Sequence, residues 1–150
     1  MLVANDDEYQ LWFLEELFQS SKFKVWKAIN GQEAFTQAQE IKAKNINLDL
    51  VVLDLNMPIS NGYEACEKIV KLFRREERKA KEVVEVEGED ETPVMVALSS
   101  FVDSQVIEQT LETGFVLTAI SPMTSDYIAK RISPLIRERR EAITLRQLLD

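Results

Sequence analysis

One carboxylate lies where a buried strand gives way to a loop. The run 48–55 is almost wholly apolar, which is typical of a strand buried on both faces of a parallel sheet. Asp54 lies near its end, and a loop containing Asn56, Pro58 and Gly62 follows. Ligands and chemistry gather at the carboxyl ends of parallel strands. Because an ionised carboxylate in such a place needs a cation or hydrogen-bond donors, Asp54 is the first candidate functional residue.

Asp54 and its neighbours also resemble a known motif. The sequence Asp54-Leu55-Asn56-Met57-Pro58, with a glycine eight residues after the aspartate, is similar to the phosphoacceptor motif of response-regulator receiver domains. These domains form the CheY-like superfamily of two-component and phosphorelay signalling. The resemblance implies that Asp54 is a nucleophile that receives a phosphoryl group and becomes an aspartyl phosphate. The donor would be a phosphohistidine on a histidine kinase or on a histidine phosphotransfer protein.

Polar residues after the first predicted strand point to a metal site. Residues 5–8 are Asn-Asp-Asp-Glu, and receivers carry an acidic pair just after this strand. Aligned on the strand, that pair falls on Asn5 and Asp6, so one acid is replaced by an amide. The resemblance implies that Asp6, Asp54, Asn5 and the backbone carbonyl of Asn56 help to hold Mg²⁺, which accepts one or two carboxylates beside its waters. The alternative is that residues 5–8 only cap the next helix.

Two serines lie at the ends of later predicted strands. Ser99 follows the strand 94–98, and the resemblance implies that its hydroxyl donates a hydrogen bond to a phosphoryl oxygen on Asp54. Ser121 lies where receivers carry a lysine whose charge pairs with the phosphoryl group. A serine can donate a hydrogen bond but has no charge. Thr118 replaces the aromatic residue that many receivers use as a rotamer switch. These replacements predict an atypical receiver in which phosphorylation and conformation are weakly coupled.

The elements that must position these residues alternate along the chain. Strands are expected at 1–4, 23–28, 48–55, 94–98 and 115–120. Helices are expected at 8–20, 32–44, after 62, at 103–113 and from 124. Such alternation predicts a doubly wound, five-stranded parallel sheet with right-handed crossovers. With the resemblance, this indicates a single flavodoxin-like (βα)5 domain of the α/β class.

Helix faces supply two further expectations. In the first helix, Trp12 and Phe13 widen the apolar face, so packing is a better explanation for them than ligand binding. The only cysteine, Cys66, falls on the core face of the third helix. The chain has no histidine, which removes Ser-His and Cys-His catalysis. We therefore expect Cys66 to be a buried, inert thiol.

Two segments depart from the regular alternation. A highly charged insertion at about 74–92 precedes the fourth strand; we expect it to prolong the third helix and then form a solvated loop, with an added contact surface as the alternative. The receiver domain is expected to span 1–136, with Pro134 kinking its last helix. Residues 137–150 would be a helical extension or linker, and a dimer through this helix is left open.

Composition sets the broad class. The chain has 150 residues, enough for one domain with a real core. Its net charge of −8 argues against nucleic acid and anionic membrane as partners. A single cysteine favours a reducing compartment, and no apolar run approaches the roughly 18 residues of a membrane span. We expect a cytoplasmic domain, cut from a longer regulator or from a hybrid histidine kinase anchored in a membrane.

Three functions follow, of which the first is preferred. The leading hypothesis is a phosphoacceptor receiver. Such a domain is not itself an enzyme, although it can hydrolyse its own aspartyl phosphate, and it can be part of a larger histidine kinase. The alternative is a degenerate receiver that docks a partner independently of phosphorylation. The third is a phosphatase with Asp54 as nucleophile, but such enzymes usually place a general acid two residues on, where this chain has Asn56.

Overall fold

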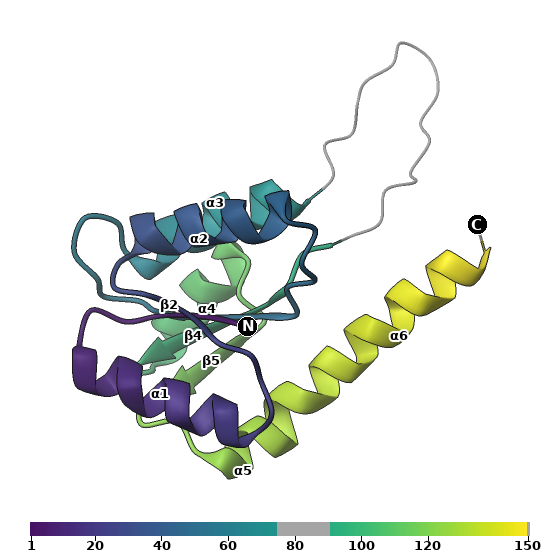
Figure 1. Ribbon diagram of the computed structural model, residues 1–150. Helices are drawn as coiled ribbons and strands as arrows, with labels where there is room; N and C mark the ends of the chain where they lie inside the picture. The colour runs from purple at the N-terminus through teal and green to yellow at the C-terminus, as the bar shows by residue number, and fades with distance from the viewer. Residues whose placement is uncertain (75–90, 150) are drawn as a thin grey trace.

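A five-stranded parallel sheet forms the centre of the computed structural model, which describes residues 1–74 and 91–149 (Figure 1). The strands lie in the order β2-β1-β3-β4-β5 and all neighbours are parallel. Their bounds are β1 Leu2–Ala4, β2 Trp26–Ala28, β3 Leu50–Asp54, β4 Val94–Ser99 and β5 Leu117–Ile120. This confirms the predicted doubly wound, flavodoxin-like fold of one domain.

Strand register brings the expected site residues to one edge of the sheet. Ala4 of β1 is opposite Leu53 of β3, and Asp54 is opposite Leu98 of β4. The residues that follow β1 therefore leave the sheet beside Asp54. The order of connections reverses between β1 and β3, which is where open α/β sheets bind their ligands.

Helices cover both faces of the sheet (Figure 1). One face carries α1 Glu8–Ser20, α5 Ser125–Tyr127, the π-helix η1 Ile128–Ile132 and α6 Ser133–Leu149; the other carries α2 Gly31–Ala43 and α3 Gly62–Phe73, with α4 Ser104–Thr113 beside α3 and β5. Two apolar clusters fill the space between the helices and the two faces. Cys66 is fully buried in one of them, as predicted.

Side-chain caps fix where the helices begin. The Asp7 carboxylate accepts hydrogen bonds from two N–H groups of α1, and Asn30, Asn61, Asp103 and Thr124 cap α2, α3, α4 and α5 in the same way. Each cap satisfies a backbone donor that has no partner inside its helix. Because the caps directly follow the strand ends or the loops after them, they also set where each loop passes the carboxyl edge.

Several predicted bounds are corrected by the structure. β2 and β5 are shorter than expected, starting at Trp26 and Leu117. The helix α3 was expected to continue into the insertion from Arg74 onward. It ends at Phe73 instead, and the backbone of Arg74 is extended, so the expectation is wrong for this residue. Residues 75–90 of the predicted insertion lie outside the described residues. The π-helix η1 ends two residues before Pro134, and the kink expected at this proline stays a prediction.

The last helix continues past the predicted domain boundary. α6 runs unbroken from Ser133 to Leu149, so the expected division between 136 and 137 falls inside it. Arg139 and Arg140 of this helix both form ion pairs with Asp49, which precedes β3. Of the helices in the described ranges, none is both long and apolar enough to cross a membrane.

Candidate functional site

Asp54 is half-buried at the carboxyl end of β3, where it meets Asp6. Its Oδ1 accepts a hydrogen bond of 3.2 Å from the backbone N–H of Asn56. Burial raises the pKa of Asp54; the Asn56 N–H opposes this rise, and the charge and hydrogen bonding of Asp6 add to it. The groups with the largest effects on this pKa include no cation. The structure thus brings together two carboxylates that repel each other when both are ionised.

Two glycines hold the loop that follows Asp54. A Cβ on Gly62 would lie 2.3 Å from the backbone oxygen of Asp54, so α3 can approach β3 this closely only without a side chain. Gly31, at the start of α2, donates its N–H to the carbonyl of Ser60 at 2.9 Å, and a Cβ there would lie 2.3 Å from that oxygen. The sequence analysis placed Gly62 in the loop and in the phosphoacceptor motif, and Asn30-Gly31 reads as a turn into a helix, but neither pattern predicted these close backbone approaches.

The residues after β1 divide their roles. Asp7 caps α1, so the capping alternative holds for this residue. Asn5 is 1% exposed; its Oδ1 accepts the N–H of Asp7 at 2.9 Å, and its Nδ2 donates to Gln10 at 3.0 Å. Asp6 is exposed, and its charge and hydrogen bonding raise the pKa of Asp54. The amide oxygen of Asn5 accepts one hydrogen bond and keeps a second lone pair that could bind a metal ion. Its role as a metal ligand stays a prediction.

Few oxygen atoms near Asp54 are available to bind a metal ion. Within residues 1–74 and 91–149 there is no cluster of three or more His, Cys, Asp or Glu side chains that could hold a metal. Asp6 and Asp54 supply two carboxylates at the loop edge, with the backbone carbonyl of Asn56 as the predicted third ligand. Hard oxygen donors in this small number fit Mg²⁺, which keeps several waters, better than Ca²⁺, which takes six to eight ligands.

Ser99 and Ser121 lie together at the ends of β4 and β5. The backbone N–H of Ser121 donates to the carbonyl of Ser99 at 2.8 Å. The buried hydroxyl of Ser99 donates to the carbonyl of Phe101 at 2.8 Å and accepts the Phe101 N–H at 3.3 Å. A phosphoryl oxygen on Asp54 would have to compete with these bonds for the hydroxyl. The Ser121–Pro122 peptide bond is cis.

Thr118 is engaged away from the carboxylates. Its Oγ1 lies 2.7 Å from Oγ1 of Thr110, a fully buried residue of α4. The hydroxyl pair joins β5 to α4 at the position where the resemblance predicts a rotating aromatic ring. This partly buried hydrogen bond favours one orientation of the Thr118 side chain, since breaking it would leave the buried Thr110 hydroxyl less well satisfied.

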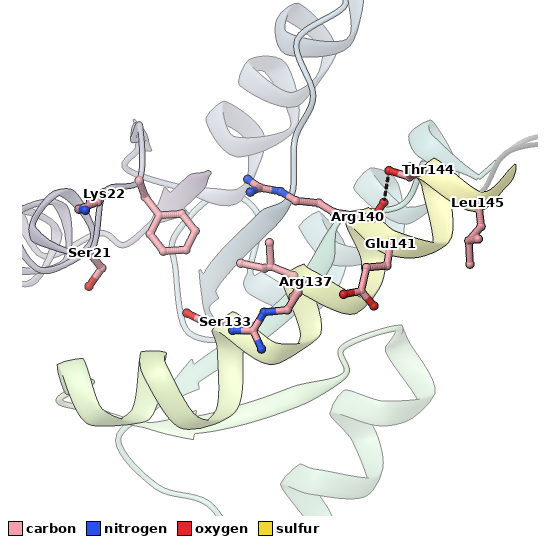
Figure 2. A pocket seen from close by; sticks show the side chains of 10 residues that line it. Ser21, Lys22, Ser133, Arg137, Arg140, Glu141, Thr144 and Leu145 are labelled. Carbon is pink, nitrogen blue, oxygen red and sulfur yellow. Dashed lines mark hydrogen bonds between the residues drawn. The ribbon is translucent and has the colours of Figure 1, made fainter. Parts of the chain in front are cut away.

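Hollows lie at both ends of the sheet, and neither of the two described below is lined by Asp54. The larger, about 780 Å³, lies between residues 21–23 and α6, at the amino end of the sheet (Figure 2). The smaller, about 230 Å³, adjoins the carboxyl edge. It is lined by Tyr9, Gln10, Phe13, Leu14, Leu98, Ser121, Pro122 and Met123; we call it the α1–β5 hollow.

The exposed aromatics of α1 correct an expectation. Trp12 is 61% and Phe13 is 42% exposed, so neither is the core residue that the apolar pattern predicted. The sheet contacts only one stripe of the helix, which Leu11, Leu14 and Phe18 fill. Apolar side chains beyond that stripe remain at the surface, and Phe13 lines the α1–β5 hollow.

Known proteins resemble this chain in sequence. The chain matches the family model described as response regulator receiver domain over residues 1–134. It is 31% identical over 105 residues to the transcriptional regulatory protein LnrK of Bacillus subtilis, covering 70% of this chain and 38% of that protein. It is 30% identical over 145 residues to the transcriptional regulatory protein PrrA of Mycobacterium leprae, covering 96% of this chain and 52% of that protein.

Solved structures share the fold. A chain from the CheX-CheY-BeF3-Mg+2 complex of Borrelia burgdorferi superposes with a TM-score of 0.69 at 20% identity, covering 89% of this chain and 86% of that one. At this identity the likeness shows the fold alone. The chain spans about half or less of the length of the two curated relatives.

Proposed function

The chain belongs to the response-regulator receiver domain family, and we propose that Asp54 is its phosphoacceptor in a two-component phosphorelay. An ionised Oδ atom of Asp54 attacks the phosphorus of a phosphohistidine on the partner. The P–O bond forms as the P–N bond breaks, and the electron pair of that bond returns to the imidazole. The partner is a histidine kinase or a histidine phosphotransfer protein.

The observation that carries this proposal is the convergence of Asp6 and Asp54 at the carboxyl edge. The pKa of the half-buried Asp54 is raised by burial and by the charge of Asp6, and such a pair of acidic residues suits a site completed by a divalent ion. We propose that Asp6, Asp54, the carbonyl of Asn56 and, through its remaining lone pair, Asn5 hold Mg²⁺. When bound, the ion supplies positive charge to the phosphoryl oxygens.

The remaining residues would act on the product. Ser99 would exchange its hydrogen bond with Phe101 for one to a phosphoryl oxygen, and Ser121 would contribute a neutral donor. Neither supplies positive charge, and Thr118 is bonded to Thr110. We therefore propose that phosphorylation changes the conformation less than it would with a lysine at 121. As a phosphoacceptor, the domain would turn over no separate substrate. Its own reaction would be the hydrolysis of its aspartyl phosphate.

Intact-mass spectrometry after incubation with acetyl phosphate and Mg²⁺ tests the proposal. We expect a single phosphoryl adduct on the native protein and none on Asp54→Asn, which keeps the size of the side chain but removes the nucleophile. Chelation of Mg²⁺ should abolish the adduct. An adduct that persists on Asp54→Asn would contradict the assignment of the acceptor. No adduct on the native protein, with one on Ser121→Lys, would instead indicate a receiver retained for docking.

A further inference from the structure

The larger hollow, between residues 21–23 and α6, has both apolar and basic lining (Figure 2). We call it the α6 hollow. Ile136 is 5% exposed, and the half-buried ring of Phe23 packs edge-on against Phe18, with 5.4 Å between the ring centroids. Leu145, which is 60% exposed, adds apolar surface from α6. At about 780 Å³, the α6 hollow is large enough for a small organic molecule.

Positive charge prevails in the lining of the α6 hollow. The lining includes one carboxylate, that of Glu141, and three cations: Lys22, Arg137 and Arg140. It therefore carries two net positive charges, in a chain whose net charge is −8. Within residues 1–74 and 91–149, no carboxylate lies at ion-pair distance from Arg137 or Lys22. The charge of both side chains is thus available to an anion.

Arg140 is held in place without being fully neutralised. Its Nε and Nη2 atoms donate to Oδ2 of Asp49 at 3.0 and 2.5 Å. Asp49 also pairs with Arg139 through Oδ1, so one negative charge is shared by two guanidinium groups. The side chain of Arg140 is 62% exposed, and Figure 2 shows it extending from α6 toward residues 21–23. A guanidinium fixed in this way presents its remaining N–H groups in a preorganised geometry.

We propose that the α6 hollow binds a small organic acid. The ionised carboxylate of the ligand contacts Arg137 and Arg140, because the planar fork of a guanidinium group matches the two oxygens of a carboxylate. The apolar body of the ligand covers Phe23, Ile136 and Leu145, which removes their exposed surface from water. The site lies at the amino end of the sheet, and binding there does not require phosphorylation.

Naphthalene-2-carboxylate serves as the probe, because it joins an ionised carboxylate to a rigid apolar body. Titrated into the full chain, it should give saturable shifts of the amide resonances of Phe23 and Arg137. Naphthalene-2-carboxamide has the apolar body without the charge, and acetate has the charge without the body, so neither should match it. An equal response to the carboxamide would overturn the recognition of charge, and an equal response to acetate would overturn the apolar contact.

Substitutions at exposed positions test the two contacts separately. Arg137→Gln should weaken binding of the probe about tenfold, the loss of one charge-assisted hydrogen bond. Arg131→Gln is its matched control, since it removes an exposed arginine of η1 that does not line the α6 hollow. Leu145→Ser should weaken binding about threefold through the lost apolar contact. Leu148→Ser, which removes an exposed leucine of α6 outside the hollow, should leave the affinity unchanged.

Three outcomes would contradict the proposed site. The absence of saturable shifts up to the solubility limit of the probe would show that the α6 hollow binds no such acid. Equal weakening by the arginine variant and its control would indicate general attraction to basic surface. Far tighter binding of 2-naphthyl phosphate than of the carboxylate would overturn the carboxylate head group. Amide resonances of the sheet, unchanged in each variant, check that the fold is retained.

Discussion

At the residue scale, Asp54 combines a chemical requirement with a cost to folding. The nucleophile must be ionised, yet burial and the neighbouring Asp6 both favour its neutral form. The Asn56 N–H offsets part of this effect. Functional sites commonly carry such unfavourable electrostatics, which the rest of the fold must compensate.

Replacing Asp54 with asparagine should therefore stabilise the protein in the absence of Mg²⁺. Because the pKa of Asp54 is raised in the folded state, the stability linked to its protonation is present below the unfolded pKa and is lost as pH rises through the folded pKa. The substituted amide would be neutral throughout. At pH 7 we expect a gain in unfolding free energy of about 0.5–1 kcal/mol, the size of a solvent-screened charge contact, narrowing toward pH 4.

Urea unfolding at both pH values measures this difference. Glu112→Gln, which removes an exposed carboxylate from α4, is the matched control and should change the unfolding free energy little at either pH. A destabilised Asp54→Asn protein at pH 7 would show that the Asn56 hydrogen bond outweighs burial and Asp6.

Sequence reasoning located the charged residues of the site better than their contacts. Asp54 and Asp6 were predictable because buried parallel strands place their following residues at one edge. The bonds from Asn5 to Gln10 and from Ser99 to Phe101 were not, since each depends on a rotamer chosen among several partners within reach. The roles predicted for Ser99, Ser121 and the metal ligands stay predictions.

At the element scale, α6 is attached to the amino edge of the sheet by one buried carboxylate. Asp49 pairs with Arg139 at 2.8 Å and with Arg140 at 2.5 Å. Arg139 also donates to the carbonyls of Thr92 and Glu91, which precede β4. The helix is thereby joined to the start of two adjacent strands, one of which carries Asp54 at its other end. Arg139 and Arg140 thus hold the start of the predicted extension against the sheet, whereas residues 144–149 are exposed.

Removing the charge of Asp49 should be costly. Asp49→Asn removes the ion pair between Asp49 and Arg139, whose side chain is only 10% exposed. We expect a loss of about 3 kcal/mol in unfolding free energy, as for a broken buried ion pair. Arg140→Gln should cost at most about 1 kcal/mol, because its side chain is 62% exposed and water replaces the lost contact. Urea unfolding measures both, and equal losses would show that Arg140 is the principal partner.

The sequence could not reveal this attachment. Alternation and apolar runs predicted every strand and the α1 bounds, because these patterns are local. The pairing of Asp49 with two arginines about 90 residues away depends on where α6 crosses the sheet, and no local pattern encodes that. The exposure of Trp12 could not be predicted from a local pattern either, since its helix has more apolar positions than the sheet can cover.

At the scale of the whole molecule, folding and site assembly are one event. Asp6 and Asp54 are distant in sequence and meet only when β1 pairs with β3. An ion held by both carboxylates therefore binds the folded chain and not the unfolded one. The net charge of −8 complicates this, because any salt also screens the repulsion between like charges in the compact state.

Mg²⁺ should consequently raise the melting temperature by a site-specific amount. A free Mg²⁺ concentration ten times the dissociation constant adds about 1.4 kcal/mol to the free energy of unfolding. For a domain of this size, that gain raises the melting temperature by roughly 3–6 °C. Differential scanning fluorimetry with MgCl₂, against NaCl of equal ionic strength, separates binding from screening. Asp54→Asn and Asp6→Asn should lose the excess shift while keeping the NaCl response. If both variants retained the full Mg²⁺ shift, the ion would be stabilising the acidic chain as a whole, and the proposed ligands would be wrong.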